Sequence, residues 1–279
     1  MLRNSIFTID VEEYFHTHGI SGAPPVSEWD SLPGRVETNL HKFFDLLSLH
    51  NVKATCFFLG YIAKKYPNLV KEAHGLGHEI ASHGMYHQLI YDMKESDFLQ
   101  DALSSRQLLE DISGTKVLGF RSPCFSATDK NPWLFDKLVE AGYEYDSSMF
   151  PASRDVGGIK SNKTDPHWIN TKYGKLYEFP ISIKRIMGKN ICFFGGGYLR
   201  LFPRAVIIKM DESLYQAGSP VLYYIHPREI DPSHPRLETG LKQRFKSYVN
   251  LNTVEPKLEA ILKKGSFLTC KEYYNNHAE

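Results

Sequence analysis

Short apolar segments alternate with segments of helical periodicity along most of the sequence, and this alternation limits the fold more than any other feature. Seven segments have the length and apolar content of buried strands: 5–10, 54–60, 79–83, 117–121, 143–146, 176–181 and 221–226. Four segments between them have helical spacing or a proline at the start: 37–50, 61–76, 95–112 and 132–141. Strands that alternate with helices of this length form βαβ units, so the sequence predicts an α/β fold with parallel strand pairing.

Ionisable side chains stand where four of the predicted strands end: Asp10, His83, Arg121 and His226. In a parallel (β/α) barrel, the carboxyl ends of the strands carry the active site. A doubly wound sheet would gather residues at the same edge, but its glycine-rich phosphate turn is missing, and the GGG at 195–197 lacks the flanking pattern of a phosphate loop. A barrel is therefore favoured.

The strand pattern fades after residue 236, where the sequence becomes Lys-rich and helical in character. We interpret this region as a helical extension and not as an independent domain. The predicted organisation is a catalytic barrel over residues 1–236 and a C-terminal extension, residues 237–279, that packs on the barrel.

Composition excludes several classes of protein. The 279 residues include 33 Lys and Arg against 32 Asp and Glu, a net charge of +1 without a long basic run, so a nucleic-acid partner is not indicated. The four cysteines, Cys56, Cys124, Cys192 and Cys270, have neither the close spacing of a thiolate zinc site nor that of a disulfide framework. No run approaches the roughly 18 apolar residues of a transmembrane helix, and carboxylates by residue 10 argue against a signal peptide. We expect a cytoplasmic protein without an integral membrane segment, and leave open an association with the inner membrane face and the oligomeric state.

Four short motifs contain the residues suited to chemistry, although each has an ordinary structural explanation. In TIDVEE, strand alternation places Asp10 and Glu12 on one side, but solvated acids at a strand end are as common. The histidines of HGMYH, His83 and His87, converge on one metal if the segment turns like a helix, but two unrelated loop histidines are the more frequent case.

The other two motifs are FRSP and YIHP. Arg121 ends a buried strand and must find a carboxylate, which is most often a structural ion pair. His226 follows an apolar strand, where a core histidine is the usual occupant. The order of the four motifs and their shared position at strand ends are more informative than any one of them.

Together, TIDVEE, GHEIASHGMYH, FRSP and YIHP resemble the polysaccharide deacetylases of carbohydrate esterase family 4, over about residues 6–226. A narrower resemblance, to a subfamily with an added C-terminal region that is often encoded in exopolysaccharide or surface-glycan assembly loci, rests on four further motifs: EFPIS at 178–182, GGGYLRLFP at 195–203, HPREIDP at 226–232 and RFKSYVNLNTVEPK at 244–257.

The resemblance implies a distorted (β/α)7 barrel that binds a divalent metal, with zinc as the expected ion, through one carboxylate and two histidines. Carried over by position, His83 and His87 are metal ligands and Asp10 is the general base. Glu12 is the expected carboxylate ligand, which departs from the family's usual pair of adjacent aspartates, and Glu13 is the second candidate. The resemblance also implies that Arg121 orients Asp10 and that His226 is the general acid.

The implied reaction removes N-acetyl groups from N-acetylhexosamine units of a polysaccharide or its precursor and releases acetate. A near-zero net charge fits a neutral glycan. Substrate contacts are expected from Pro123, Phe125, Tyr198 and Arg200, with a backbone N–H near 124–125 as an oxyanion donor. His16 and His18 lie close to the first motif, where they are either cleft residues or, as we favour, ordinary surface histidines.

Two other functions remain open at this stage. One is an allantoinase-like cyclic amidase of the same fold family, acting on a small ligand. The other is a catalytically inactive carbohydrate-binding protein, which the presence of all the motif residues disfavours. Metal content and acetate release would separate the three.

Overall fold

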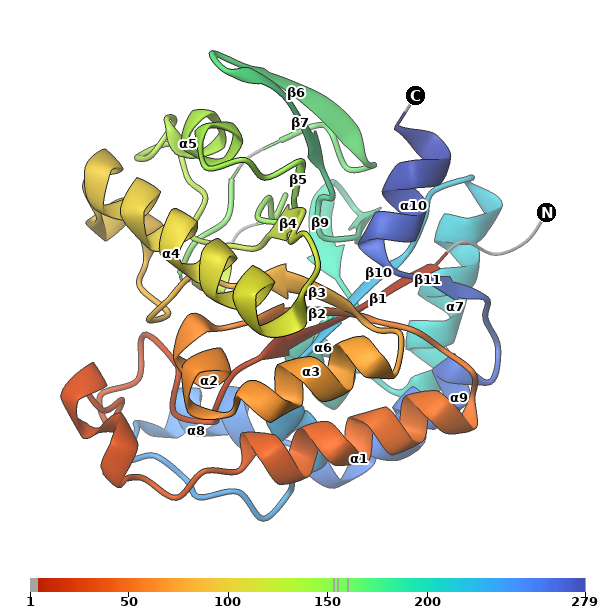
Figure 1. The fold of residues 1–279 in the computed structure, drawn as a ribbon. Coiled ribbons are helices and arrows are strands. Elements are labelled where there is room, and N and C mark those ends of the chain that lie inside the picture. Colours follow the sequence, from red (N-terminus) through yellow and green to blue (C-terminus); the bar gives the residue numbers. More distant parts are fainter. Residues whose placement is uncertain (1–4, 153, 155, 160, 279) are drawn as a thin grey trace.

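Seven parallel strands form a curled sheet at the centre of the molecule (Figure 1). The computed structural model describes residues 5–152, 154, 156–159 and 161–278. In spatial order the seven strands are β10 (Leu222–Ile225), β1 (Ser5–Val11), β2 (Thr55–Phe58), β3 (Glu79–Ser82), β4 (Gly119–Phe120), β5 (Tyr145–Asp146) and β7 (Gly174–Glu178). This order confirms the predicted distorted (β/α)7 barrel, although most of the strands are shorter than their predicted segments.

The barrel has a seam between β7 and β10. Among the described residues, no strand pairing joins these two strands. Instead, the hydroxyl of Ser182, four residues beyond β7, accepts a hydrogen bond from the amide of Leu222 (2.9 Å) and donates one to the carbonyl of Pro220 (3.3 Å). This edge of β10 is thus bonded by a side chain at Leu222 and by the backbone of Phe194 at Tyr224 (3.1 Å), and not by a strand of the barrel.

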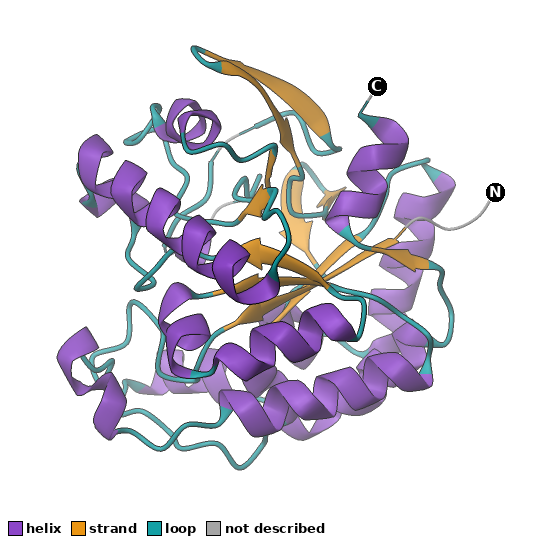
Figure 2. Cartoon of the chain, in the orientation of Figure 1, coloured by secondary structure: helices purple, strands orange, loops and turns teal. Residues whose placement is uncertain are grey.

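Helices surround the sheet (Figure 2). They are α1 (Val36–Leu49), α2 (Gly60–Lys65), α3 (Pro67–Gly75), α4 (Glu95–Ser113), α5 (Leu134–Glu140), α6 (Gly196–Leu201) and α7 (Arg204–Gln216), with short 3₁₀ turns η1 (Val26–Ser31), η2 (Ile90–Asp92), η3 (Pro123–Phe125) and η4 (Pro227–Ile230). The single helix predicted over 61–76 is wrong, because the chain breaks at Tyr66 (φ −130°, ψ 63°). Proline disfavours helical conformation in the residue before it, so Pro67 starts a new helix.

Two antiparallel hairpins were not predicted. β6 (His167–Thr171) pairs with β7 at the edge of the main sheet, and β8 (Ile183–Ile186) pairs with β9 (Lys189–Cys192) in a separate small sheet. β6 lies just before the predicted strand 176–181, and the hairpin of β8 and β9 lies between the predicted strands 176–181 and 221–226. Hairpins need only local pairing, so they insert without changing the order of the parallel strands.

The C-terminal region is mainly helical, as expected, but it also adds a strand. It contains α8 (Leu241–Tyr248), η5 (Leu251–Thr253), α9 (Val254–Leu262), β11 (Phe267–Leu268) and α10 (Cys270–His277). β11 pairs in parallel with the start of β1, and the amide of Cys270 donates to the hydroxyl of Thr55 on β2 (2.7 Å). The region is therefore bonded into the barrel sheet, while the boundary at residues 236 and 237 stays a prediction.

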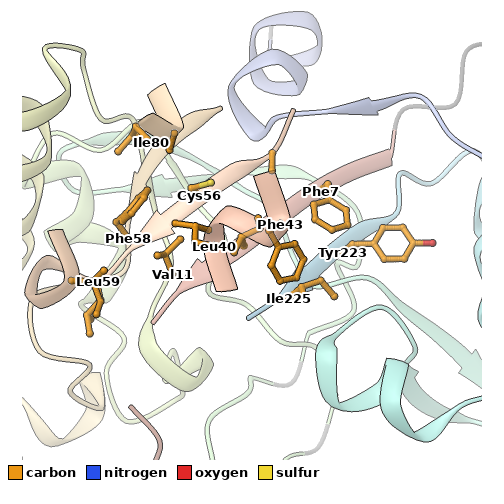
Figure 3. Packing of buried hydrophobic residues seen from close by; sticks show 14 of the residues in the cluster. Phe7, Val11, Leu40, Phe43, Cys56, Phe58, Leu59, Ile80, Tyr223 and Ile225 are labelled. Atoms are coloured by element: carbon orange, nitrogen blue, oxygen red, sulfur yellow. The ribbon is translucent and has the colours of Figure 1, made fainter. Parts of the chain in front are cut away.

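Side chains of β1 alternate between two apolar layers. Phe7, Ile9 and Val11 pack in the larger cluster beneath the helices, together with Leu40 and Phe43 of α1 (Figure 3). Ile6 belongs to a second cluster on the other face of the sheet. Burial of each large apolar side chain contributes about 1.5–3 kcal/mol. Thr8 and Asp10 lie on the same face of β1 as Ile6, which points into the barrel. Polar groups buried there need hydrogen-bond partners.

No helix in the described part of the chain has the length and apolar character needed to cross a membrane. All four cysteines are free, and none forms a disulfide in the described residues. The predicted cytoplasmic location stays a prediction.

His78 makes the stability of the fold dependent on pH. Its ring is buried and stacks on Phe44 (centroids 5.0 Å apart), and its Nδ1 accepts a hydrogen bond from the amide of Ala54. Burial, assisted by the charge of Lys53, lowers the pKa of His78 from 6.5 to about 4. Between these values the unfolded chain binds more protons than the folded one, so this contribution to stability is present above pH 6.5 and is lost as pH falls toward 4.

We therefore expect the free energy of unfolding of His78→Gln to depend less on pH between about 4 and 6.5 than that of the wild type. The difference between the two slopes should correspond to close to one proton bound on unfolding. Urea unfolding at a series of pH values, with chelator present, measures the two slopes. His74→Gln, at an exposed position of α3, is the control and should keep the wild-type slope. Equal slopes in all three proteins would contradict this account.

Candidate active site

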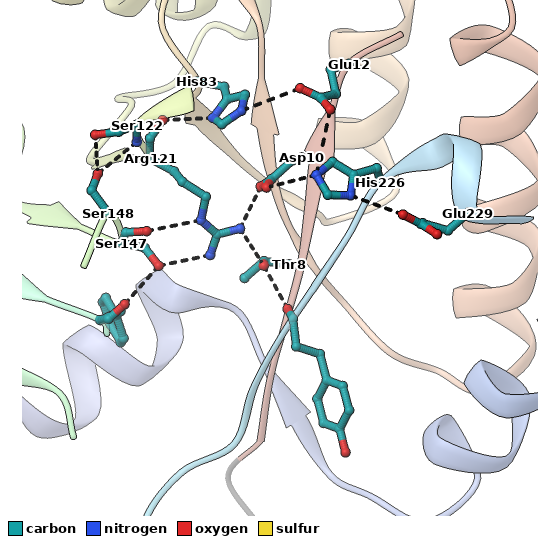
Figure 4. Close-up of polar contacts among 12 residues, drawn as sticks. Thr8, Asp10, Glu12, His83, Arg121, Ser122, Ser147, Ser148, His226 and Glu229 are labelled. Carbon is teal, nitrogen blue, oxygen red and sulfur yellow. Dashed lines mark hydrogen bonds and ion pairs between the residues drawn. The ribbon is translucent and has the colours of Figure 1, made fainter. Parts of the chain in front are cut away.

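Asp10 and Glu12 stand at the carboxyl end of β1 and point to the same side of the sheet (Figure 4). Val11, between them, is fully buried in the core beneath the helices. Both carboxylates are nearly buried as well, with 2% of Asp10 and 5% of Glu12 exposed. The alternation predicted for this motif is therefore present, and the solvated strand end is not what the structure shows.

Arg121, at the end of β4, supplies the charge that Asp10 needs. It is fully buried, and its Nη1 donates to Oδ1 of Asp10 (2.6 Å) and to the hydroxyl of Thr8 (2.8 Å). Its other nitrogens donate to the carbonyl and hydroxyl of Ser147, just after β5. A guanidinium cannot shed its charge, so these bonds hold the carboxyl group of Asp10 in one orientation through Oδ1, while Oδ2 lies 3.8 Å from His226.

His83 and His87 come together through a tight turn and not through a helix, so the helical convergence considered for this motif is wrong. β3 ends at Ser82, and Gly84 (φ +73°) and His87 (φ +53°) both adopt left-handed conformations. Asp101 of α4 holds the turn by accepting a hydrogen bond from the amide of Met85 (3.0 Å). The turn brings the two imidazole centroids to 5.3 Å from each other.

Glu12, His83 and His87 form a group of buried donors suited to a metal ion. One ligand atom from each lies within 4.8 Å of the others, and Nε2 of His87 is 2.6 Å from Oε2 of Glu12. Nδ1 of His83 donates to the carbonyl of Arg121 (2.8 Å), which leaves Nε2 as the free lone pair. Burial lowers the pKa of His83 to about 4 and so favours the neutral imidazole that coordinates metals. One carboxylate and two histidines with an oriented tautomer fit a catalytic divalent metal site.

The electrostatics of Glu12 agree with this fit. Burial alone would raise its pKa, but His87, His226 and His83 outweigh burial and hold the pKa well below its ordinary value. Its buried Oε2 has no partner with hydrogen-bond geometry among the described residues. The carboxylate is thus kept ionised and available to a cation.

Glu13 belongs to a different structure. Its Oε1 accepts hydrogen bonds from the amides of Arg35 (2.7 Å) and Val36 (2.9 Å), where α1 begins. A carboxylate at a helix N-terminus satisfies free amides and interacts favourably with the helix dipole. Glu13 therefore caps α1, and Glu12 is the carboxylate that faces the two histidines.

His226 lies at the end of β10, the strand next to β1, close to Asp10 and Glu12 (Figure 4). Its Nε2 is 3.8 Å from Asp10 and 3.7 Å from Glu12, and its Nδ1 is 3.6 Å from Oε1 of Glu229. Burial by itself lowers the pKa of His226. The negative charges of Glu229, Glu12 and Asp10 raise it by more, so the pKa lies above the ordinary histidine value. Glu229 was missed by the sequence reasoning, although it stands three residues after His226 in HPREIDP.

Glu229 is held by Arg200 of α6 through a buried ion pair, and Arg200 also donates to the carbonyl of Lys246 on α8 (2.8 Å). The GGG segment makes room for this arrangement. A Cβ on Gly196 would approach Oε1 of Glu229 to 2.4 Å, and one on Gly195 would approach the ring of Tyr224 to 2.1 Å. The glycines thus allow close packing, which agrees with the absence of a phosphate-loop pattern.

A cleft of about 490 Å³ opens over these residues. Asp10, Glu12, His83, His87 and His226 all line it, as do three of the four predicted substrate contacts, Phe125, Tyr198 and Arg200. Pro123, the fourth, is buried in η3 and is absent from the lining, although Ser122 and Cys124 on either side contribute to it. The amide of Phe125 donates to the carbonyl of Ser122 (3.0 Å) and is not free to act as an oxyanion donor.

His16 and His18 also line the cleft, so their interpretation as surface histidines is wrong. Only 2% of His16 is exposed, because its ring packs against Trp29 (centroids 4.1 Å apart). His18 stacks on His87 at 5.3 Å and donates from Nε2 to the backbone carbonyl of His87 (2.6 Å). Both histidines thereby support the turn that carries His87. Their nearness to the first motif was the only signal in the sequence.

Comparisons with known proteins bear on the fold and on the family. Residues 26–145 match the family model described as polysaccharide deacetylase, and residues 147–275 match one described as a domain of unknown function, DUF3473. The two matches meet inside the parallel sheet, where β5 pairs with both β4 and β7, so they do not delimit separate sheets. A peptidoglycan-N-acetylglucosamine deacetylase of Bacillus cereus is 29% identical over 116 residues, which cover 42% of this chain and 41% of that protein. The chain matches between 30% and 45% of the length of the curated relatives.

Solved structures extend the likeness of the fold over nearly the whole chain. A candidate polysaccharide deacetylase of Mycobacterium smegmatis superposes with a TM-score of 0.66 at 17% identity, covering 98% of this chain and 89% of that one. Puue allantoinase superposes with a TM-score of 0.62 at 15% identity, covering 99% and 91%. At such identities the likeness concerns the fold alone. The fold therefore does not decide between a glycan deacetylase and a cyclic amidase. Only the residues of the site can decide between these two functions.

The separate positions of Glu12 and Glu13 generate opposite expectations for two neighbouring variants. Glu12→Ala removes a metal donor and should weaken zinc binding by more than about 100-fold, whereas Glu13→Ala should keep it. Glu13→Ala removes the cap of α1 and should lower the free energy of unfolding by about 1–2 kcal/mol. Calorimetric zinc titration and urea unfolding check both variants. If Glu13→Ala lost zinc binding while it remained folded, the assignment of the carboxylate would be reversed.

Proposed function

We propose that the chain is a polysaccharide deacetylase, a metal-dependent hydrolase that removes N-acetyl groups from N-acetylhexosamine units of a glycan and releases acetate. The match of residues 26–145 to the polysaccharide deacetylase family model supports this proposal. The observation that carries this proposal is the meeting of Asp10, Glu12, His83, His87 and His226 in one cleft. These residues supply a cation site, a base and an acid around one space. An inactive carbohydrate-binding protein would need none of the three.

Asp10 is the proposed general base. Its Oδ1 is occupied by Arg121, while Oδ2 lies 3.8 Å from Nε2 of His226, and both residues line the cleft. The carboxylate takes a proton from the attacking water, and its bonds to Arg121 keep it in one orientation while it does so. Arg121 contacts no substrate in this scheme and acts only by positioning Asp10.

His226 is the proposed general acid. It stands beside Asp10 at the end of the neighbouring strand β10, and its raised pKa favours the protonated imidazolium. A general acid must protonate the amine nitrogen as the C–N bond of the acetamide breaks, because an amide anion is too poor a leaving group. The proton from water and the proton to nitrogen thus travel through two residues that come from different strands, β1 and β10.

Glu12, His83 and His87 would hold the metal ion, for which we propose zinc, since two imidazoles and one carboxylate are typical of catalytic zinc sites. A divalent cation bound there supplies Lewis acidity toward the water and the amide carbonyl. Around it, His83 is oriented through the carbonyl of Arg121 and His87 through the stacked His18. We further propose that the glycan belongs to surface or exopolysaccharide assembly, as the resemblance of the C-terminal motifs implies.

Replacement of the base tests the central assignment. Asp10→Asn should lower kcat for acetate release from N-acetylglucosamine oligomers by about 100- to 10,000-fold, because general base catalysis is lost. Zinc binding should persist, since Asp10 is not among the three donors. Acetate release, zinc titration and a chelator treatment reversed by added zinc make up the measurement.

The same assay separates the alternatives. A protein that hydrolyses allantoin but no acetamido sugar would be a cyclic amidase. A protein that binds sugar oligomers but releases no acetate with any added divalent metal ion would be a carbohydrate-binding protein. Full activity of Asp10→Asn would show that the base lies elsewhere.

Glu229 is a positioning residue, because it contacts His226 and not the reacting group. Glu229→Gln removes the charge that raises the pKa of His226. We expect kcat/KM to fall by about 10- to 100-fold and the alkaline limb of the pH profile to move to lower pH, because the imidazolium deprotonates more readily. Glu229→Asp, which keeps the charge, should move the limb less. A lower rate with an unmoved limb would indicate a merely structural role.

A further inference from the structure

The cleft contains two arginines that the proposed chemistry does not use. Arg154 lies in the segment after β5, and Arg228 lies in η4, two residues after His226. Both line the cleft alongside Asp10 and His226. Arg228 stands in the turn that follows His226, and Arg154 lies against the ring of Phe125, which also lines the cleft.

The carboxylates of the cleft do not account for these arginines. Asp10 is paired with Arg121 and Glu229 with Arg200, while Glu12 faces His83 and His87 in the group of metal donors. Arg228 comes no closer than 4.0 Å to Glu229, whose charge is already matched. No carboxylate among the described residues pairs with Arg154. Without any bound metal, the cleft thus carries positive charge beyond what its own acids neutralise.

Two aromatic rings hold the guanidinium of Arg154. Its guanidinium lies over the ring of Phe150 (4.6 Å to the centroid) and close to that of Phe125 (5.0 Å). Cation–π contacts engage the face of a guanidinium, whereas its N–H groups point outward in the plane. Nη1 of Arg154 and Nε of Arg228 are both buried without a hydrogen-bond partner in the described structure. The protein therefore leaves the hydrogen-bonding capacity of both guanidinium groups unfilled, at residues that line the cleft.

We propose that Arg154 and Arg228 form an anion subsite, and that the substrate is an acidic glycan whose carboxylate or phosphate group lies within about one sugar of the reacting acetamide. Guanidinium groups bind these planar or tetrahedral oxyanions through charge-assisted and often bidentate bonds. A neutral glycan offers hydroxyl acceptors but no negative charge to balance the two guanidinium groups. The near-zero net charge of the chain suggested a neutral substrate, but a sum over the whole surface does not describe one cleft. This inference rests on the proposed deacetylase function and names the class of its substrate.

Binding to the metal-depleted wild-type protein tests the subsite without turnover and without any contribution of a cation to anion affinity. The probes form two matched pairs. The first is a tetrasaccharide that alternates N-acetylglucosamine with glucuronic acid, against the neutral N-acetylglucosamine tetrasaccharide. The second is N-acetylglucosamine 1-phosphate against N-acetylglucosamine. We expect the anionic member of at least one pair to bind about 10-fold or more tighter, with the preference falling as salt is raised.

Variants locate the preference in the molecule. Arg154→Gln and Arg228→Gln should each reduce the ratio of anionic to neutral affinity by about 10-fold, and the lysine variants should retain part of it. Arg185→Gln, at an exposed position of β8, is the matched control and should leave the ratio unchanged. Circular dichroism confirms that each variant is folded.

The two possible failures are distinguishable. If neither anionic probe is preferred, or if the preference survives in the Arg154→Gln/Arg228→Gln double variant, the subsite proposal is overturned even when neutral oligomers are deacetylated. If no glycan releases acetate while the anionic preference depends on both arginines, the subsite stands and the deacetylase function fails. The pair that shows the preference identifies the anion as a uronate or a phosphate.

Discussion

The ion pair between Arg121 and Asp10 is the interaction on which the rest of the site depends. A fully buried guanidinium requires full hydrogen bonding, and Arg121 obtains it from Thr8 and Asp10 on β1 and from Ser147 beyond β5. Removal of one partner of such a pair typically costs about 3–5 kcal/mol. The pair therefore ties three strands together at their carboxyl ends. The same bonds set the orientation of the proposed base, so stability of the barrel and geometry of the site are consequences of one contact.

The region beyond the parallel strands contributes to the same centre. Arg200 of α6 joins Glu229 of η4 to Lys246 of α8, and Glu229 in turn stands beside His226. Three motifs that lie far apart in the sequence thus meet around the proposed acid. Ser182, from a fourth motif, bonds to Pro220 and Leu222 at the start of β10, the strand that ends at His226. These contacts give a physical reason for the narrower resemblance, because its motifs contain the residues that complete the site.

Much of the fold could be predicted from local patterns. The order of apolar strands and amphipathic helices follows from residue periodicity, and Pro67 could have located the break that the prediction over 61–76 overlooked. The hairpins and β11 could not be found in this way. A two-residue strand such as Phe267–Leu268 has no period of its own and is a strand only because the start of β1 lies beside it.

The sequence by itself determined which residue types stand at the strand ends and in which order, because strand period and chain direction fix where a side chain emerges. It thereby placed Asp10, His83, Arg121 and His226 at one edge. Only the tertiary structure decided between Glu12 and Glu13, since adjacent carboxylates differ solely in what they meet: two histidines in one case and the first amides of α1 in the other. It likewise decided the turn that brings His87 to His83, the burial of His16, and the local charge contributed by Arg154 and Arg228. Distances between residues far apart in sequence follow from packing, and no local pattern records them.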